Sequence, residues 1–118
     1  MRPIPLKLRA KMSENPFMSK CAYPDCYANP EFEHCFLYGK SQINTEWAII
    51  PICTYHHRGA GLNKKFNRWV SIMRTDINDY RDFPKVNWIQ LKKSLNDDFK
   101  HKYDINLILK PDLYKNEN

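Results

Sequence analysis

The sequence predicts a small α+β fold, in which a metal-bound finger is followed by C-terminal helices. Three observations lead to this prediction. Cysteine and histidine recur at metal-ligand spacing in the first half of the chain, two short apolar segments there are typical of strands, and apolar residues recur at helical spacing in the second half. A chain of 118 residues is long enough for one core, so we expect a single domain over 1–118.

Residues 1–20 are predicted to form an extended basic arm or a short edge strand. Pro3, Pro5 and Pro16 interrupt this segment, and its apolar residues alternate with others. The alternating residues are Ile4, Leu6 and Leu8.

Residues 21–75 are predicted to form the finger. A turn through Pro24 and Asp25 is expected first, then two strands that enclose a loop. The predicted first strand, loop and second strand cover residues 32–38, 39–44 and 47–53. The second strand is apolar on both faces, so it should be buried.

Helices are expected from there to the C-terminus, with 76–118 as a helical extension. A short helix near 56–59 should be interrupted by Gly59 and Gly61. Two further helices are predicted over 62–73 and 86–103, separated by a capped turn over 75–79. The apolar stripe of the last helix predicts either a core contact or a dimer contact, and Lys110-Pro111 should end regular structure.

Four residues have the spacing of a structural zinc site. Cys21 and Cys26 form a C-x4-C pair, and Cys53 and His56 form a C-x-x-H pair, which together supply three thiolates and one imidazole for tetrahedral zinc. The alternatives are buried cysteines with a surface histidine, or a disulfide scaffold. Cys35 is left over and is expected to pack as a small apolar group.

His57 is left over as well. Neighbours on a helix point about 100° apart, so His56 can face the zinc while His57 faces elsewhere. Glu33 and His34 lie in the segment that zinc would hold next to that helix, so Glu33, His34 and His57 are candidates to converge on one catalytic divalent cation. If His57 bound the zinc instead, His56 would be free.

These residues resemble the HNH nucleases, a family with a ββα-metal fold and a zinc-binding treble-clef variant. Glu33-His34 matches the acid-histidine pair of the family's first strand, Ile49 to Cys53 matches its second strand, and Cys53 to His57 matches its knuckle, with His56 in place of a cysteine. A phage-type subgroup is similar at His34-Cys35-Phe36-Leu37-Tyr38-Gly39 and at His56-His57-Arg58-Gly59.

The resemblance implies a DNA endonuclease of phage or mobile-element recombination. His34 would be the general base, Glu33 and His57 would hold Mg²⁺, Mn²⁺ or Ni²⁺, and Arg58 would contact phosphate. The family's middle asparagine is replaced by Ala48, which favours the alternative of a non-catalytic zinc-stabilised DNA-binding module. A protein-interaction finger is a third hypothesis.

The charge distribution predicts a polyanionic partner. Residues 1–75 hold 11 Lys and Arg against 5 Asp and Glu, whereas 76–118 hold 8 of each, so the net charge of +6 lies with the metal motifs. With no apolar run long enough for a membrane span or signal peptide, we expect a cytoplasmic protein of a bacterial or phage-infected cell, with a homodimer as an option. The predicted nucleic-acid contacts are Lys40, Arg58, Lys64, Lys65 and Arg68.

Overall fold

The first element is a helix, α1 (Leu6–Ser13), followed by a 3₁₀ turn, η1 (Pro16–Ser19), in the computed structural model, which describes residues 4–109. The prediction of an extended arm was therefore wrong for this segment. Pro5 stands just before the helix, where its missing N–H costs nothing, and strong helix formers follow it. Ile4 and Met12 are buried while Leu6 is 85% exposed, so apolar side chains are buried at helical spacing. Pro3 and Lys110-Pro111 lie outside the described residues.

Two antiparallel strands form the sheet beneath the metal motifs. Strand β1 (Glu31–His34) pairs with β4 (Ile49–Ile52), with Glu33 opposite Ile50 and His34 opposite Ile49. Every residue of β4 is buried, as its apolar sequence predicted. The short 3₁₀ turn η2 (Glu46–Ala48) precedes β4, so the second strand is shorter than predicted.

A separate hairpin lies between β1 and β4 in the sequence. It consists of β2 (Leu37–Tyr38) and β3 (Ser41–Gln42), so the prediction of one strand over 32–38 and a loop over 39–44 was wrong. Gly39 and Lys40 have φ of 56° and 70°, which closes a two-residue turn whose twist matches the flanking strands. Gly-Lys is a weaker signal for such a turn than Asn-Gly, which is why the sequence did not reveal it.

The helices follow the sheet in chain order. Helix α2 (Thr54–Arg58) ends at Gly59, as predicted, and α3 (Lys64–Ile72) begins after Asn63, whose Oδ1 accepts a hydrogen bond from the Phe66 N–H. A 3₁₀ turn, η3 (Ile77–Tyr80), carries the expected cap. The two long predicted helices are present as α3 and α4 (Trp88–Phe99), each shorter than predicted at both ends. The final helix, α5 (Ile105–Leu109), was not predicted.

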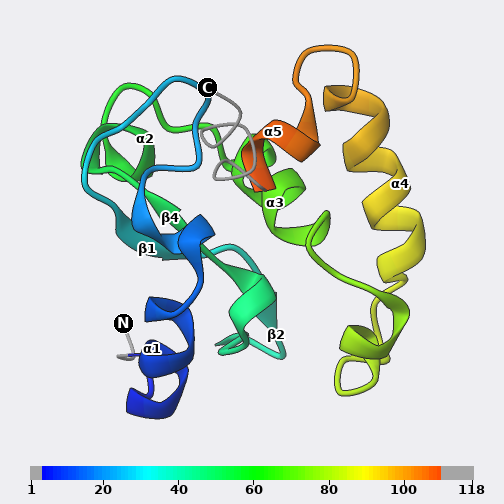
Figure 1. The fold of residues 1–118 in the computed structure, drawn as a ribbon. Coiled ribbons are helices and arrows are strands. Elements are labelled where there is room, and N and C mark those ends of the chain that lie inside the picture. Colours follow the sequence, from blue (N-terminus) through cyan, green and yellow to red (C-terminus); the bar gives the residue numbers. More distant parts are fainter. Residues whose placement is uncertain (1–3, 110–118) are drawn as a thin grey trace.

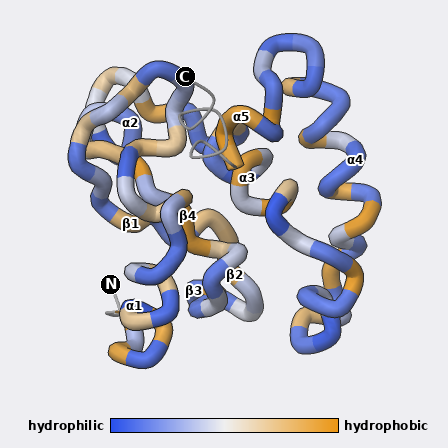
Figure 2. The backbone as a smooth tube through the Cα atoms, viewed as in Figure 1, coloured by the Kyte–Doolittle hydropathy of each residue, from blue (hydrophilic) through white to orange (hydrophobic). Residues whose placement is uncertain are grey.

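Helix α3 lies at the centre of the molecule, between the β1–β4 sheet and α4 (Figure 1). Phe66 and Trp69 are fully buried, and the Trp69 ring stacks on Phe99 of α4 at 5.4 Å between centroids. The apolar stripe of α4 is thus buried within the same chain, which identifies it as core. Figure 2 shows the hydrophobic stretches of β4 and α5 and the alternation along α4. Among residues 4–109 no helix is long and apolar enough to cross a membrane.

Candidate metal centre and adjoining cleft

Cys21, Cys26, Cys53 and His56 lie together, with their ligand atoms all within 4.8 Å of one another. The Sγ atoms of Cys26 and Cys53 are 3.8 Å apart, and His56 Nδ1 is 3.2 Å from Cys53 Sγ and 3.5 Å from Cys21 Sγ. Two sulfurs bound tetrahedrally at about 2.3 Å from one zinc are about 3.8 Å apart. The spacing and the donor set therefore fit structural zinc.

Backbone hydrogen bonds bring the first two cysteines to the sheet. The Ala22 N–H donates to Pro51 O of β4 at 2.9 Å, and the Cys26 N–H donates to Tyr23 O at 3.1 Å. Asp25 adopts the left-handed conformation, with φ of 61°, that closes the turn. The knuckle thus packs on β4, whose chain continues directly into the second ligand pair.

Cys53 and His56 come from the junction of β4 and α2. Cys53 is the residue before α2, so His56 follows one helical turn later and faces the same way. The His56 ring stacks on Tyr23, with 3.9 Å between centroids and 4° between planes. Gly61 leaves room for this ring, because a Cβ there would lie 2.8 Å from His56 Cδ2 and 2.4 Å from the Tyr55 ring.

Burial makes a thiolate at Cys21 unfavourable without a cation. It raises the pKa of the Cys21 thiol to about 12, despite hydrogen bonds from backbone N–H groups. A thiolate at this position needs nearby positive charge, which Zn²⁺ supplies when it binds.

His57 points away from this cluster and towards β1. Its Nδ1 lies 2.7 Å from Glu31 Oε1, while Glu31 Oε2 accepts hydrogen bonds from Thr54 and Arg58, each at 2.7 Å. The Thr54 and His57 hydrogen bonds, together with Arg58, lower the pKa of Glu31 to about 2. The tautomer that donates Nδ1–H to this carboxylate leaves Nε2 as the free ring nitrogen.

Glu33 lies two residues from Glu31, on the same side of β1. It contacts α3 and not His57: Asn67 Nδ2 donates to Glu33 Oε2 at 2.5 Å. Burial raises the pKa of Glu33, although the charges of His57, Lys64 and Arg68 and the Asn67 hydrogen bond oppose this effect. The structure thus pairs His57 with Glu31, while the predicted metal ligand Glu33 is hydrogen-bonded to Asn67.

His34 is held by a side chain from the segment that follows the hairpin. Its Nε2 lies 2.7 Å from Asn44 Oδ1. With the proton on Nε2, the Nε2–H group donates a hydrogen bond to Asn44 Oδ1, and Nδ1 keeps its lone pair. Ala48, the residue at the family's asparagine position, is fully buried. Asn44 contacts the imidazole although it is out of register with that position.

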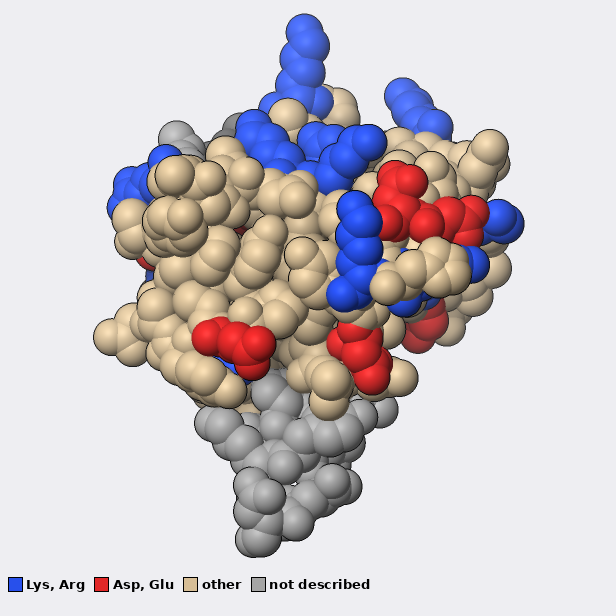
Figure 3. Space-filling view, turned by 90° about the horizontal axis from the view of Figure 1, so that it is seen from above, with Lys and Arg blue, Asp and Glu red and all other residues tan. Residues whose placement is uncertain are grey.

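Glu33 and His34 open into a cleft of about 600 Å³. Its other walls come from α3, α4 and the segments beside them, and three of the five predicted nucleic-acid contacts lie there: Lys64, Lys65 and Arg68. Lys40 and Arg58 are not among the lining residues, and Arg58 is paired with Glu31. Figure 3 shows Lys and Arg side chains gathered along one edge of the face seen from above, with Asp and Glu on the same face.

Asn67 also lines this cleft, and it was missed in the sequence. Asn67 is 1% exposed, and within the described part of the chain its Oδ1 has no hydrogen-bond partner. Exchanging the amide atoms would not help, because an ionised Glu33 needs the donor. The available signal was that Asn67 is a polar residue next to the apolar stripe of the predicted helix. Glu31 and Asn44, also missed, carried no comparable signal.

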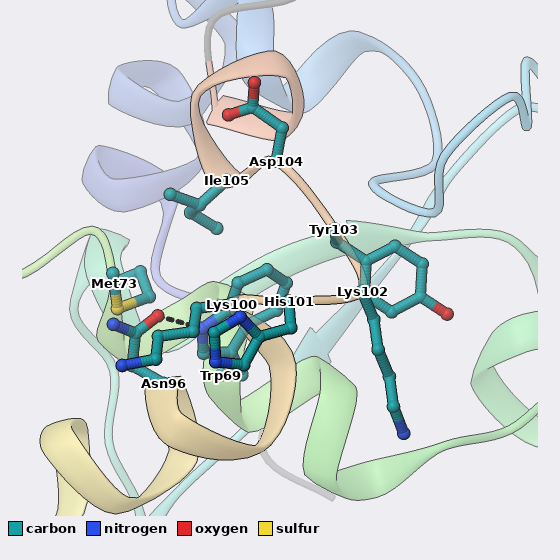
Figure 4. A pocket seen from close by; sticks show the side chains of 9 residues that line it. All are labelled: Trp69, Met73, Asn96, Lys100, His101, Lys102, Tyr103, Asp104 and Ile105. Carbon is teal, nitrogen blue, oxygen red and sulfur yellow. Dashed lines mark hydrogen bonds between the residues drawn. The ribbon is translucent and has the colours of Figure 1, made fainter.

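A second pocket, of about 500 Å³, lies between the end of α4 and α5 (Figure 4). Asn96 Oδ1 accepts a hydrogen bond from Trp69 Nε1 at 3.1 Å beside it, and His101 lies on its rim. None of the predicted site residues lines this pocket.

Within residues 4–109, the three cysteines and His56 are the one group of three or more Cys, His, Asp or Glu side chains placed to hold a metal ion. Glu33 and His57 do not form a second group of that kind. Comparison of the chain with protein-family models, with curated proteins and with solved structures found no match.

Proposed function

We propose that this protein is a metal-dependent HNH-type endonuclease that hydrolyses DNA phosphodiester bonds, built on a zinc-bound ββα-metal finger of the treble-clef kind. The observation that carries the proposal is the composition of one cleft. Glu33 and His34 line it together with Lys64, Lys65 and Arg68. A carboxylate, an imidazole and several fixed cations are the groups that phosphodiester hydrolysis requires.

In the proposed reaction His34 is the general base. Asn44 Oδ1 accepts a hydrogen bond from the Nε2–H group, so the lone pair on Nδ1 is free to take a proton from the attacking water. The cations on α3 bind the phosphate and stabilise the charge that develops on its oxygens. Because Arg58 is already paired with Glu31, the phosphate contacts are assigned first to α3.

Glu33 and His57 would hold the divalent cation. A buried carboxylate with a raised pKa and an unpartnered amide oxygen on Asn67 are hard oxygen donors that a cation would satisfy, so the donor set fits Mg²⁺ or Mn²⁺. Ni²⁺ suits the imidazole of His57. When bound, such an ion polarises the phosphate and stabilises the leaving oxygen.

The second candidate function is a zinc-stabilised DNA-binding module without catalysis. Ala48 at the family's asparagine position favours it, as does the fact that Glu33 and His57 are not part of a group of three or more convergent metal-ligand atoms among the described residues. The cleft's cations serve either function. Three metal-binding thiolates suit a reducing compartment, so we place the protein in the cytoplasm of a bacterial or phage-infected cell, acting in recombination.

Nicking of supercoiled plasmid tests the proposal. Zinc-loaded protein is incubated with Mg²⁺, Mn²⁺ or Ni²⁺, or with no added metal, and compared with His34→Ala. His101→Ala is the matched control, because it removes an exposed histidine outside the cleft. We expect metal-dependent nicking that His34→Ala lowers by about 100-fold or more and His101→Ala leaves unchanged.

Nicking by His34→Ala at the wild-type rate would exclude His34 as the base. Absence of nicking with every metal, together with DNA binding that weakens steeply with salt, would favour the non-catalytic module.

A further inference from the structure

Two walls of the cleft, those from α3 and α4, differ in chemistry. Helix α3 contributes Lys64, Lys65 and Arg68, whereas the wall from α4 and the residue Val86 before it is mainly apolar. Asp98 supplies that wall with its only charged side chain among the lining residues. The apolar side chains of this second wall are Val86, Trp88, Leu91 and Leu95.

Part of the apolar surface is open to solvent. Val86 is 36% exposed, and Leu37 of β2, at the cleft's rim, is 65% exposed. Leu91 is half-buried. Large apolar side chains exposed beside a row of cations indicate a ligand with one anionic edge and one apolar edge.

A single DNA strand has these two edges. Its phosphates can follow the α3 wall while its unpaired bases contact the apolar wall. A basic groove for the backbone beside a surface for the bases is how single strands are bound without sequence preference, with aliphatic side chains here in place of the usual aromatic ones. A duplex presents two phosphate backbones with its bases paired between them. Its second backbone would face apolar side chains and the Asp98 carboxylate, which is unfavourable.

The size of the cleft agrees with this argument. About 600 Å³ is within the range of pockets that enclose a ligand, roughly 300–1,000 Å³. Proteins that read a duplex instead place a protruding helix or ribbon in a groove about 12 Å wide. Glu33 and His34 line the cleft, so a phosphate must enter it to reach them.

We propose that the cleft selects an unpaired DNA strand, with the backbone on α3 and the bases against Val86, Leu91 and Leu37. This inference rests on the proposed function for its chemistry, since it names the substrate of the same site. It places the target of the enzyme in single-stranded segments, such as gaps, flaps or displaced strands.

Fluorescence anisotropy tests strand selection without requiring cleavage. Zinc-loaded protein, with no other divalent metal, is titrated into a fluorescein-labelled 15-nucleotide DNA strand, the same strand annealed to its complement, and an RNA strand of the same sequence. The Kd for the single DNA strand is expected to be about tenfold or more below that for the duplex. Equal or tighter duplex binding would overturn the proposal, and tighter RNA binding would make RNA the strand selected.

Paired variants test the two walls. Val86→Glu places a carboxylate on the apolar wall, and Ile89→Glu, on an α4 position that is 62% exposed and outside the cleft, is its matched control. Val86→Glu should weaken single-strand binding about tenfold, with Ile89→Glu unchanged. Lys64→Gln should reduce the slope of log K against log salt by about 0.7, whereas Lys7→Gln on α1 should not.

Equal effects of Val86→Glu and Ile89→Glu would exclude base contacts on the apolar wall. Zinc content and circular dichroism show whether each variant is folded, and the comparison of strand with duplex uses the unmodified protein alone. Selective binding without cleavage of the single DNA strand in Mg²⁺, Mn²⁺ or Ni²⁺ would retain the strand proposal and reject the nuclease, whereas metal-dependent cleavage with equal duplex affinity would do the reverse.

Discussion

Asn67 donates one hydrogen bond, to Glu33, and its second polar atom has no partner among the described residues, although the side chain is 1% exposed. A buried polar atom without a partner lowers stability by about 1–3 kcal/mol. Together with the buried carboxylate, it marks a place where the fold is not optimised for its own stability. Such places are expected at functional sites.

Glu33→Gln should therefore stabilise the protein and abolish nicking. The new amide still accepts from Asn67 Nδ2 and can also donate to Oδ1, which would raise the free energy of unfolding by about 1 kcal/mol near pH 7. Thermal unfolding in parallel with plasmid nicking measures both effects. A variant that is less stable at pH 7, or that still nicks, would contradict the role of Glu33.

The same substitution has a predictable pH dependence. Folding raises the pKa of Glu33 above its ordinary 4.5, so the protonated form favours folding, and this stability is complete below 4.5 and is lost as pH rises through the raised value. The advantage of Glu33→Gln should accordingly grow as pH rises from 4.5 towards neutrality. An advantage that shrinks over this range would mean that the carboxylate is favourably paired.

Glu31 is expected to orient His57. Glu31→Gln removes the negative charge and replaces one of the two acceptor oxygens with an NH₂ donor, so Thr54, His57 and Arg58 cannot all keep their hydrogen bonds. The His57 ring then loses its fixed tautomer, and affinity for Mn²⁺ should fall about 10- to 100-fold. Calorimetric titration with Mn²⁺ and nitrogen-15 NMR of the histidine rings measure these changes. Glu46→Gln, in η2, is the control, and equal Mn²⁺ affinity in both variants would exclude the orienting role.

At the scale of elements, the spacing of apolar residues predicted those helices that bury a continuous apolar stripe. The spacing of Phe66, Trp69 and Val70 identified α3, and that of Leu91, Leu95 and Phe99 identified α4. Helix α1 was missed because Pro5 and the alternation of Ile4, Leu6 and Leu8 resembled an edge strand. Met12, which shows the helical spacing, lies after these alternating residues. The β2–β3 hairpin was missed because two left-handed residues, Gly39 and Lys40, decide it locally.

The candidate site was predictable to a similar degree. Ligand spacing identified the zinc cluster, because four such residues have few other arrangements in a small chain. Glu31, Asn44 and Asn67 could not be found, since their roles depend on contacts between separate elements: β1 with α2, the hairpin with β1, and α3 with β1. Sequence patterns report faces of one element and not these contacts.

Gly61→Ala tests how α2 and the following turn accommodate the zinc ligand. The added Cβ would meet the rings of Tyr55 and His56, so His56 should be displaced and zinc affinity should fall by about tenfold or more. Gly39→Ala is the control. It strains a residue with φ of 56° but meets no atom within 4 Å, so it should lower stability and leave zinc affinity unchanged. Competition with a zinc-binding dye measures both affinities, and equal affinities would contradict this packing.

For the whole molecule, the metal-ligand cluster joins segments that are far apart in the sequence, and zinc bound there would hold them together. The knuckle, the end of β4 and the start of α2 meet at the cluster, and the adjoining β1 and α3 line the cleft. Small domains of this kind depend on such a metal, because their core alone supplies little stability. The site's geometry is thus linked to metal binding.

Cys53→Ser and Cys35→Ala should separate a zinc ligand from a core cysteine. Cys53→Ser should lose zinc and unfold the finger, whereas Cys35→Ala should keep zinc and lose about 1 kcal/mol from a small cavity. Plasma mass spectrometry for zinc and thermal unfolding measure the two outcomes. Loss of zinc from Cys35→Ala, or its retention in Cys53→Ser, would contradict the assignment.

Both candidate functions require the zinc centre, so X-ray absorption at the zinc K edge of the purified chain is the most direct test of this account. It should show one zinc ion with three sulfurs at about 2.3 Å and one nitrogen at about 2.0 Å, and the same shell in His57→Ala. A chain without zinc, or a shell of nitrogen and oxygen alone, would contradict the proposed centre.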